Sequence, residues 1–154
     1  MNWTESQIRI TPLMPGGDYA MEIVSVFRGI LSAAARIPFM QSPATPKNFR
    51  KLAMLTNETS LVLQWDPPDG FVDTYYLLID APVQPNESLA PPFTLRHVFQ
   101  KLKPGQTYQV AITSVRGNFT SIPSVINATT SMRTLFTVNL LGFNLFLEYG
   151  GHPF

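Results

Sequence analysis

Apolar and polar residues alternate along several short stretches of the chain, as they do in strands that bury one face. In the stretch TSLVLQW, the residues Leu61, Leu63 and Trp65 fall on one face of a predicted strand. Val62 and Gln64 fall on its other face. We therefore expect a β-strand here, with Trp65 in the core of the domain.

The pattern continues downstream. Residues 74–79 (TYYLLI) are rich in strand-forming residues, with Tyr75, Leu77 and Ile79 as the expected inward set. Residues 82–92 carry four prolines, which cannot donate ladder hydrogen bonds, so this segment predicts an irregular connection at a sheet edge. The remaining predicted elements are a strand over 108–115, a hairpin tip at 116–118 and a returning strand over 119–129.

The chain also matches itself at a fixed offset. Residues 13–27 (LMPGGDYAMEIVSVF) and 102–116 (LKPGQTYQVAITSVR) share Leu-x-Pro-Gly-x-x-Tyr, followed by an alternating stretch that contains Ser-Val. An offset of 89 residues separates Tyr19 from Tyr108. That spacing has the size of a β-sandwich module and is too long for one turn of a solenoid.

The repeated motif has a structural explanation. Pro-Gly makes a tight turn, because proline presets φ and glycine accepts a positive φ. The tyrosine ring is expected to pack at a sheet corner while its hydroxyl bonds upstream backbone, which is the tyrosine corner of Greek-key sandwiches. We assign structural and not catalytic roles to this set: Trp65, Leu102, Pro104, Gly105, Tyr108 and Tyr19.

Composition narrows the function classes. The chain has 154 residues, of which 45% are hydrophobic and only 14% charged, so it can build a core. Its 14 prolines and 9 glycines favour turns over long helices. A net charge of +1 gives no field that would attract nucleic acid or an anionic membrane. The absence of cysteine excludes disulfides, cysteine nucleophiles and thiolate metal sites, and no cofactor is expected.

Neither terminal segment has the sequence pattern of a signal peptide or of a membrane-spanning helix. Residues 1–18 lack an apolar core of the kind that a secretory signal has, so we expect no signal peptide in this chain. Residues 135–149 are apolar but include Asn139, Asn144 and Glu148. A spanning helix needs about 20 apolar residues, so we expect no membrane insertion.

Five Asn-x-Ser/Thr sequons are present, which is dense for a chain of this length. Asn57 and Asn86 fall in predicted loops and Asn118 in the hairpin tip, where a glycosylating enzyme can reach them. Asn127 falls in a predicted strand, and Asn2 stands at the start of the chain. The glycosylation candidates are therefore Asn57, Asn86, Asn118 and Asn127. The alternative is a polar β protein whose sequons are unused.

The sequence offers little evidence for a metal site or a catalytic site. His97 and His152 have no spaced partners for a metal site or a catalytic triad, and His97 is expected at the surface. Asp66, Asp69 and Asp73 cluster near one turn, but nothing there resembles a calcium loop. We expect no metal site and no catalytic residue.

Trp65 followed by Pro-Pro-Asp-Gly, a tyrosine-rich strand and then Leu-x-Pro-Gly-x-x-Tyr resembles a fibronectin type III module. The resemblance implies an all-β, immunoglobulin-like sandwich. It divides the chain into the C-terminal part of one module (1–42), a complete module (43–130) and a divergent apolar tail (131–154). Residues 1–40 lack the opening strands of their module, so we expect them to be poorly anchored alone.

The phrase NETSLVLQWDPPDG (57–70) is similar to the repeats of receptor-type protein tyrosine phosphatase ectodomains, although tenascins share the pattern. The resemblance implies an extracellular or cell-surface fragment that acts in protein–protein interaction, adhesion or spacing, beside neighbouring modules of the same type. The partner would be an extracellular protein ligand. A tenascin-like matrix module and an accessory domain of a secreted enzyme are the alternatives. A phosphatase domain needs a cysteine nucleophile, so this chain cannot carry that activity.

Some type III modules present Arg-Gly-Asp to integrins at the hairpin where this chain has Arg116-Gly117-Asn118. An amide replaces the carboxylate that a metal-dependent receptor needs. We therefore interpret the tripeptide as a hairpin turn.

Overall fold

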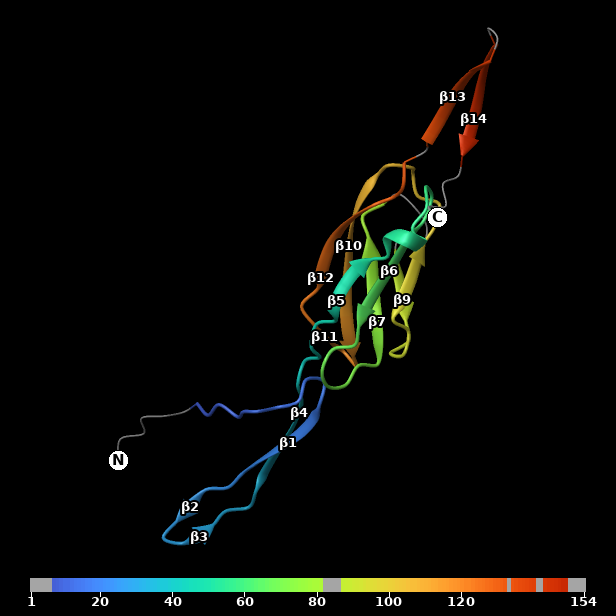
Figure 1. Ribbon diagram of the computed structural model, residues 1–154. Helices are drawn as coiled ribbons and strands as arrows, with labels where there is room; N and C mark the ends of the chain where they lie inside the picture. Colours follow the sequence, from blue (N-terminus) through green and yellow to red (C-terminus); the bar gives the residue numbers. More distant parts are fainter. Residues whose placement is uncertain (1–6, 82–86, 133, 141–142, 150–154) are drawn as a thin grey trace.

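The computed structural model describes residues 7–81, 87–132, 134–140 and 143–149. At its centre lies a sandwich of two antiparallel sheets (Figure 1). One sheet has the strand order β5 (Lys47–Lys51), β6 (Leu61–Asp66), β9 (Arg96–Phe99). In the other sheet, β10 (Thr107–Arg116) pairs with β7 (Thr74–Ile79), which pairs with β8 (Glu87–Ala90); β10 also pairs with β11 (Phe119–Thr120) and β12 (Ser124–Thr129). The predicted all-β sandwich is confirmed.

The core lies between the two sheets. The Trp65 ring packs edge-on against the Tyr75 ring, with centroids 5.3 Å apart, and against the Phe49 ring at 6.5 Å. Such aromatic pairs add stability beyond the area that they bury. Val62, on the other face of β6, is also buried, and the single-turn 3₁₀ helix η1 (Ala53–Leu55) packs against that strand. The predicted inward residues are all fully buried: Leu61, Leu63, Trp65, Tyr75, Leu77 and Ile79.

One predicted connection is a strand. The segment 82–92 was expected to be irregular throughout, but Glu87–Ala90 forms β8 and pairs with β7. No proline lies between residues 86 and 90, so the backbone there keeps its hydrogen-bond donors, and the edge position needs a partner on one side only. Ala90 is buried in the core. The expectation was therefore wrong for residues 87–90.

The N-terminal unit is a long two-stranded ribbon. β1 (Asp18–Ile23) pairs with β4 (Ala35–Met40), and β2 (Val26–Phe27) pairs with β3 (Ile30–Leu31). Within the described ranges no second sheet covers this ribbon, and all four residues of β2 and β3 are exposed by 64% or more. Two-stranded ribbons are marginally stable by themselves. The expectation that residues 1–40 are poorly anchored alone concerns stability in isolation and stays a prediction.

The apolar tail forms a hairpin. β13 (Thr134–Leu140) and β14 (Phe143–Tyr149) pair in antiparallel register. The hairpin and the N-terminal ribbon extend from opposite ends of the sandwich (Figure 1). Among the residues that the structure describes, no helix has the length and apolarity to cross a membrane.

Candidate inter-module joint

The ribbon meets the sandwich at the turn that precedes β1. Pro15 and Gly16 form the corner, and Gly17 closes the turn by donating its N–H to the Met14 carbonyl at 3.1 Å. Gly16 has φ +68°, a left-handed conformation that glycine adopts without strain. The Tyr19 hydroxyl accepts the Met14 N–H at 2.6 Å. The repeated motif of the sequence therefore builds a rigid corner.

The loop between β6 and β7 lies directly against this turn. Phe71 donates its N–H to the Pro15 carbonyl at 3.0 Å. A Cβ atom on Gly16 would lie 2.1 Å from the Phe71 carbonyl oxygen, and one on Gly70 would lie 2.0 Å from the Pro15 carbonyl oxygen. Only glycine lets two backbones approach so closely. The contact between the units thus depends on a glycine from each side.

Arg116, at the end of β10, joins the two units. Its Nη1 donates to Asp73 Oδ1 at 2.6 Å, and its Nε donates to the Gly16 carbonyl at 3.2 Å. Its Nη2 lies 3.3 Å from Asp18 Oδ2, and its guanidinium lies over the Phe71 ring, 5.6 Å from the centroid. Arg116, Asp73 and Phe71 belong to the sandwich, whereas Gly16 and Asp18 belong to the ribbon. One planar guanidinium thereby contacts both sides. We call these five residues, with Pro15 and Gly70, the joint.

The charges of the joint stabilise one another. Gly117 donates its N–H to Asp73 Oδ2 at 2.9 Å and so lowers the pKa of Asp73, which the hydrogen bond from Arg116 lowers further. The Asp73 carboxylate in turn raises the pKa of Arg116, and Asp18 adds to that rise. The Arg116 side chain is 26% exposed, whereas its partners Asp73 and Asp18 are 48% and 67% exposed, so salt in the solvent still screens these ion pairs.

The linker between the units is anchored on both sides. Gly16 donates its N–H to the Ser42 carbonyl at 3.2 Å, which ties the start of the linker to the ribbon. Thr45 Oγ1 donates to the Ile122 carbonyl at 2.9 Å, which ties its end to the sandwich. Pro43 between them is buried. The chain that connects the units therefore adds to the joint.

The predicted structural residues lie where the motif places them. The Tyr108 hydroxyl accepts the Lys103 N–H at 2.9 Å, five residues upstream, which is the contact that Tyr19 makes in the ribbon. Leu102 and Tyr108 are buried, and Gly105, next to Pro104, has φ +65°. In both corners the tyrosine hydroxyl accepts the N–H of the residue five positions upstream, although Tyr108 lies in a complete core and Tyr19 in a ribbon.

The Arg116-Gly117-Asn118 tripeptide forms a hairpin turn between β10 and β11, as predicted. Gly117 has φ +53°, and Asn118 is exposed. Arg116, however, is bound to other residues of the joint, since it donates to the Gly16 carbonyl and to Asp73. It is the residue that sequence reasoning missed, because nothing in the tripeptide indicates which segment its guanidinium contacts.

The three clustered carboxylates take different partners and do not converge. Asp69 pairs with Lys47 Nζ at 2.7 Å, and Asp66 accepts from Asn48 Nδ2 at 2.6 Å. Asp73 belongs to the joint. Within the described part of the chain, no group of three metal-ligating side chains comes together.

His97 is half-buried on β9, although a surface position was expected. Its ring packs edge-on against Phe99, with centroids 4.6 Å apart. Burial lowers its pKa. The expectation failed because the Phe99 side chain, two residues along the same strand, covers one edge of the imidazole.

Three of the four glycosylation candidates lie in the described residues, and all three are exposed. Asn57 lies in the loop before β6, Asn118 at the hairpin tip and Asn127 on β12. Asn86 lies outside the described residues. Exposure permits modification, and the occupancy of each sequon stays a prediction.

Comparison with known proteins identifies the sandwich. The family model of the fibronectin type III domain matches residues 45–129, more than half of the chain. The chain belongs to the fibronectin type III family. The resemblance drawn from Trp65 and the tyrosine corner is thereby confirmed at the level of the family, whose domains are generally non-catalytic modules.

The curated relatives include tenascins. The chain is 28% identical to tenascin of Gallus gallus over 134 residues and 26% identical to tenascin-R of Homo sapiens over 131 residues. These matches cover 83% and 82% of this chain but only 7% and 9% of the relatives. The fibronectin type III segment described here thus spans a small part of the proteins that it matches.

Two solved structures with tandem domains have the same fold. A two-domain fibronectin type III segment from chicken tenascin aligns with a TM-score of 0.63 at 26% identity, over 75% of this chain and 66% of that one. Domains d3–d4 of the rat CD45 extracellular region align with a TM-score of 0.52 at 13% identity, over 84% and 72% of the two chains. The second likeness concerns the fold alone.

Proposed function

We propose that this chain is a segment of an extracellular tandem fibronectin type III protein that acts as a spacer and adhesion module of the tenascin kind. The observation that carries the proposal is the joint, in which a turn of one unit docks on the loops of the next. The alignment with a two-domain tenascin segment, which reaches well beyond the sandwich itself, supports it.

The mechanism is geometric. A joint built from backbone contacts and a shared guanidinium fixes the direction in which one module leaves the next. Modules joined in this way hold their exposed loops and strand edges at set separations, where extracellular protein ligands can contact them. The non-contact faces would be kept soluble by glycans.

The proposal is tested by measuring whether cells attach to the folded chain and whether this attachment depends on the fold. The full chain, secreted from mammalian cells behind an added signal peptide, is immobilised and challenged with suspended cells. We expect it to appear in the medium and to retain more cells than the Trp65→Ala variant, whose core should be strongly destabilised. Equal attachment to both proteins, or retention of the parent chain inside the cells, would count against the proposal.

A receptor ectodomain is the second candidate, and the phrase 57–70 favours it. In a receptor-type tyrosine phosphatase, the parent protein would continue into a membrane span and a catalytic domain with a cysteine nucleophile. In a matrix protein it would continue into further modules. The downstream sequence of the parent transcript separates the two.

A further inference from the structure

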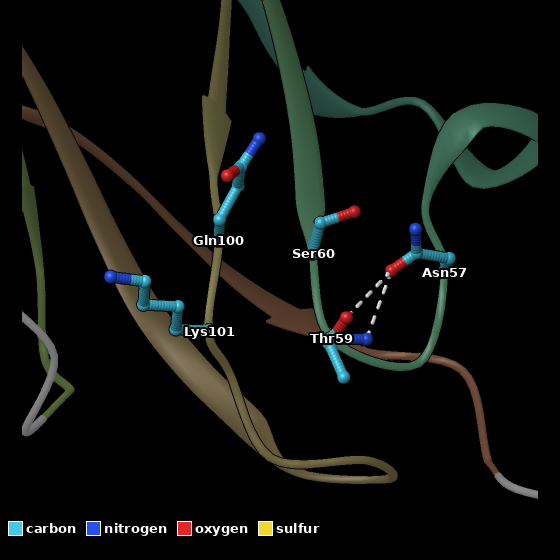
Figure 2. A pocket seen from close by; sticks show the side chains of 5 residues that line it. All are labelled: Asn57, Thr59, Ser60, Gln100 and Lys101. Atoms are coloured by element: carbon cyan, nitrogen blue, oxygen red, sulfur yellow. Dashed lines mark hydrogen bonds between the residues drawn. The ribbon is translucent and has the colours of Figure 1, made fainter.

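A polar groove lies beside Asn57, in the loop between η1 and β6 (Figure 2). The helix η1 lies at the end of the sandwich opposite the N-terminal ribbon (Figure 1). It has a volume of about 410 Å³. Its lining side chains carry amide, hydroxyl and ammonium groups, with no aromatic ring and no carboxylate: Asn57, Thr59, Ser60, Gln100 and Lys101. Sites for apolar small molecules are lined mostly by hydrophobic side chains. This lining instead offers hydrogen-bond donors and acceptors to a hydroxyl-rich ligand.

Asn57 is held at the edge of the groove. Its Oδ1 accepts hydrogen bonds from the Thr59 N–H at 2.9 Å and from the Thr59 hydroxyl at 3.5 Å. This leaves the amide nitrogen pointing away from Thr59 (Figure 2). The backbone of Asn57 is pinned as well, because its N–H bonds the Ser60 carbonyl at 3.2 Å and its carbonyl accepts the Ser131 N–H at 3.1 Å. An exposed amide nitrogen on a fixed backbone can carry a substituent in a defined direction.

We propose that Asn57 carries an N-linked glycan whose first N-acetylhexosamine lies in this groove, against Gln100 and Lys101. The proposal rests on the extracellular function proposed above, since the transfer occurs in the secretory pathway. The donor is an oligosaccharide linked through pyrophosphate to a lipid. The bond from Asn57 Nδ2 to the sugar C1 forms as the C1–O bond to pyrophosphate breaks. Nδ2 gives up one proton, and the lipid pyrophosphate leaves with the electron pair.

Attachment explains how so polar a groove can be occupied. A free sugar would bind there weakly, because few apolar atoms are available for burial. A sugar tethered to the rim is present at an effective concentration on the order of millimolar or more. Each hydrogen bond to the Gln100 amide or the Lys101 ammonium then forms within one molecule, and the glycan stabilises the loop that it grows from.

The other described sequons lack this setting. Asn118 follows Gly117, whose N–H holds Asp73 in the joint, so a glycan there would stand beside the ribbon. Asn127 lies on the exposed face of β12, opposite Gln109. Neither residue lines the groove, and this distinguishes Asn57 from both.

The modification is tested in the full chain secreted with an added signal peptide. Thr59→Ala removes the sequon but leaves Asn57, and Thr59→Ser keeps the sequon as the matched control. Glycopeptide mass spectrometry should find Asn57 occupied in the parent and in Thr59→Ser, and bare in Thr59→Ala. Bare Asn57 in the parent overturns the proposal. Glycopeptides are measured both in the medium and in the cell fraction. The occupancy of Asn57 can therefore be determined even if the chain is not secreted, and secretion itself tests the proposed function.

The position of the sugar is tested by melting. The glycan is trimmed enzymatically to one N-acetylhexosamine, and the product is compared with Asn57→Gln. We expect the single-sugar form to melt about 4 °C higher, the shift that about one net hydrogen bond gives in a domain of this size. Gln100→Ala should abolish most of this difference, whereas Lys103→Ala, outside the groove, should preserve it. A difference that Gln100→Ala leaves intact shows that the sugar lies elsewhere.

Discussion

Trp65 is a large, fully buried side chain of the sandwich core, and its ring contacts the rings of Phe49 and Tyr75. Replacing it with alanine leaves a cavity between the sheets, so Trp65→Ala should lower the free energy of unfolding by about 3–5 kcal/mol. Phe93→Ala is the matched control, because Phe93 is 84% exposed and its loss should change stability by less than about 0.5 kcal/mol. Denaturant titration of both variants measures the contrast. Similar midpoints for the two would contradict the core assignment.

Two glycines with similar backbone conformations should respond differently to substitution by alanine. Gly70 and Gly29 both have positive φ, at +85° and +80°, so a side chain strains the backbone at each. A Cβ at Gly70 also meets the Pro15 carbonyl, whereas one at Gly29 meets nothing within 4 Å. Gly70→Ala should therefore open the joint and speed amide hydrogen exchange at Phe71, and Gly29→Ala should not. Unchanged exchange in Gly70→Ala would mean that the loops are not in contact.

At the scale of single residues, the sequence predicted the burial of Trp65 and its neighbours because strand alternation reports directly on which face is covered. It could not predict the role of Arg116. A long polar side chain reaches several ångströms from its own strand, so its partners depend on how two separate units meet. The half-buried state of His97 was missed because it depends on how the neighbouring Phe99 ring is oriented.

Among the elements, the tyrosine corner is the one that the chain builds twice. Tyr108→Phe removes the hydroxyl that accepts the Lys103 N–H, which should cost about 0.5–1.5 kcal/mol of sandwich stability. Tyr19→Phe makes the same change in the ribbon and is the control, since it should leave the main unfolding transition of the sandwich in place. Thermal unfolding followed by circular dichroism distinguishes them. An unaltered transition in Tyr108→Phe would contradict a structural role for that hydroxyl.

The sequence predicts an element well where the contacts that form it are local, and poorly where they involve distant residues. Leu-x-Pro-Gly-x-x-Tyr predicted both corners, since the turn and the hydroxyl contact are local and need no distant partner. The strand β8 was missed because the surrounding prolines dominate the segment, while Ala90 is drawn into the core by its pairing with β7. A short edge strand gives few residues from which alternation can be read.

At the scale of the whole molecule, the joint should weaken in acid. The pKa of Asp73 is lower in the folded chain than in the unfolded chain, so the stabilisation from its ionised form is complete above the unfolded pKa and is lost as the pH falls through the folded pKa. Exchange of the Phe71 amide, corrected for its intrinsic pH dependence, should therefore accelerate below about pH 4. Asp73→Asn should show fast exchange at every pH. A parent protein whose protection persists well below that pH would show that the carboxylate does not hold the joint.

The most direct test is the distance across the joint. Because the chain has no cysteine, Ala20→Cys on β1 and Gln109→Cys on β10 introduce two unique sites for spin labels. Pulsed dipolar spectroscopy should give one narrow distance distribution for the labelled parent. Arg116→Ala should broaden it, and Arg116→Lys should broaden it as well, since lysine keeps the charge but loses the planar fork. A distribution that is broad in the parent, or equally narrow in Arg116→Ala, would contradict the claim that Arg116 fixes the N-terminal ribbon on the sandwich.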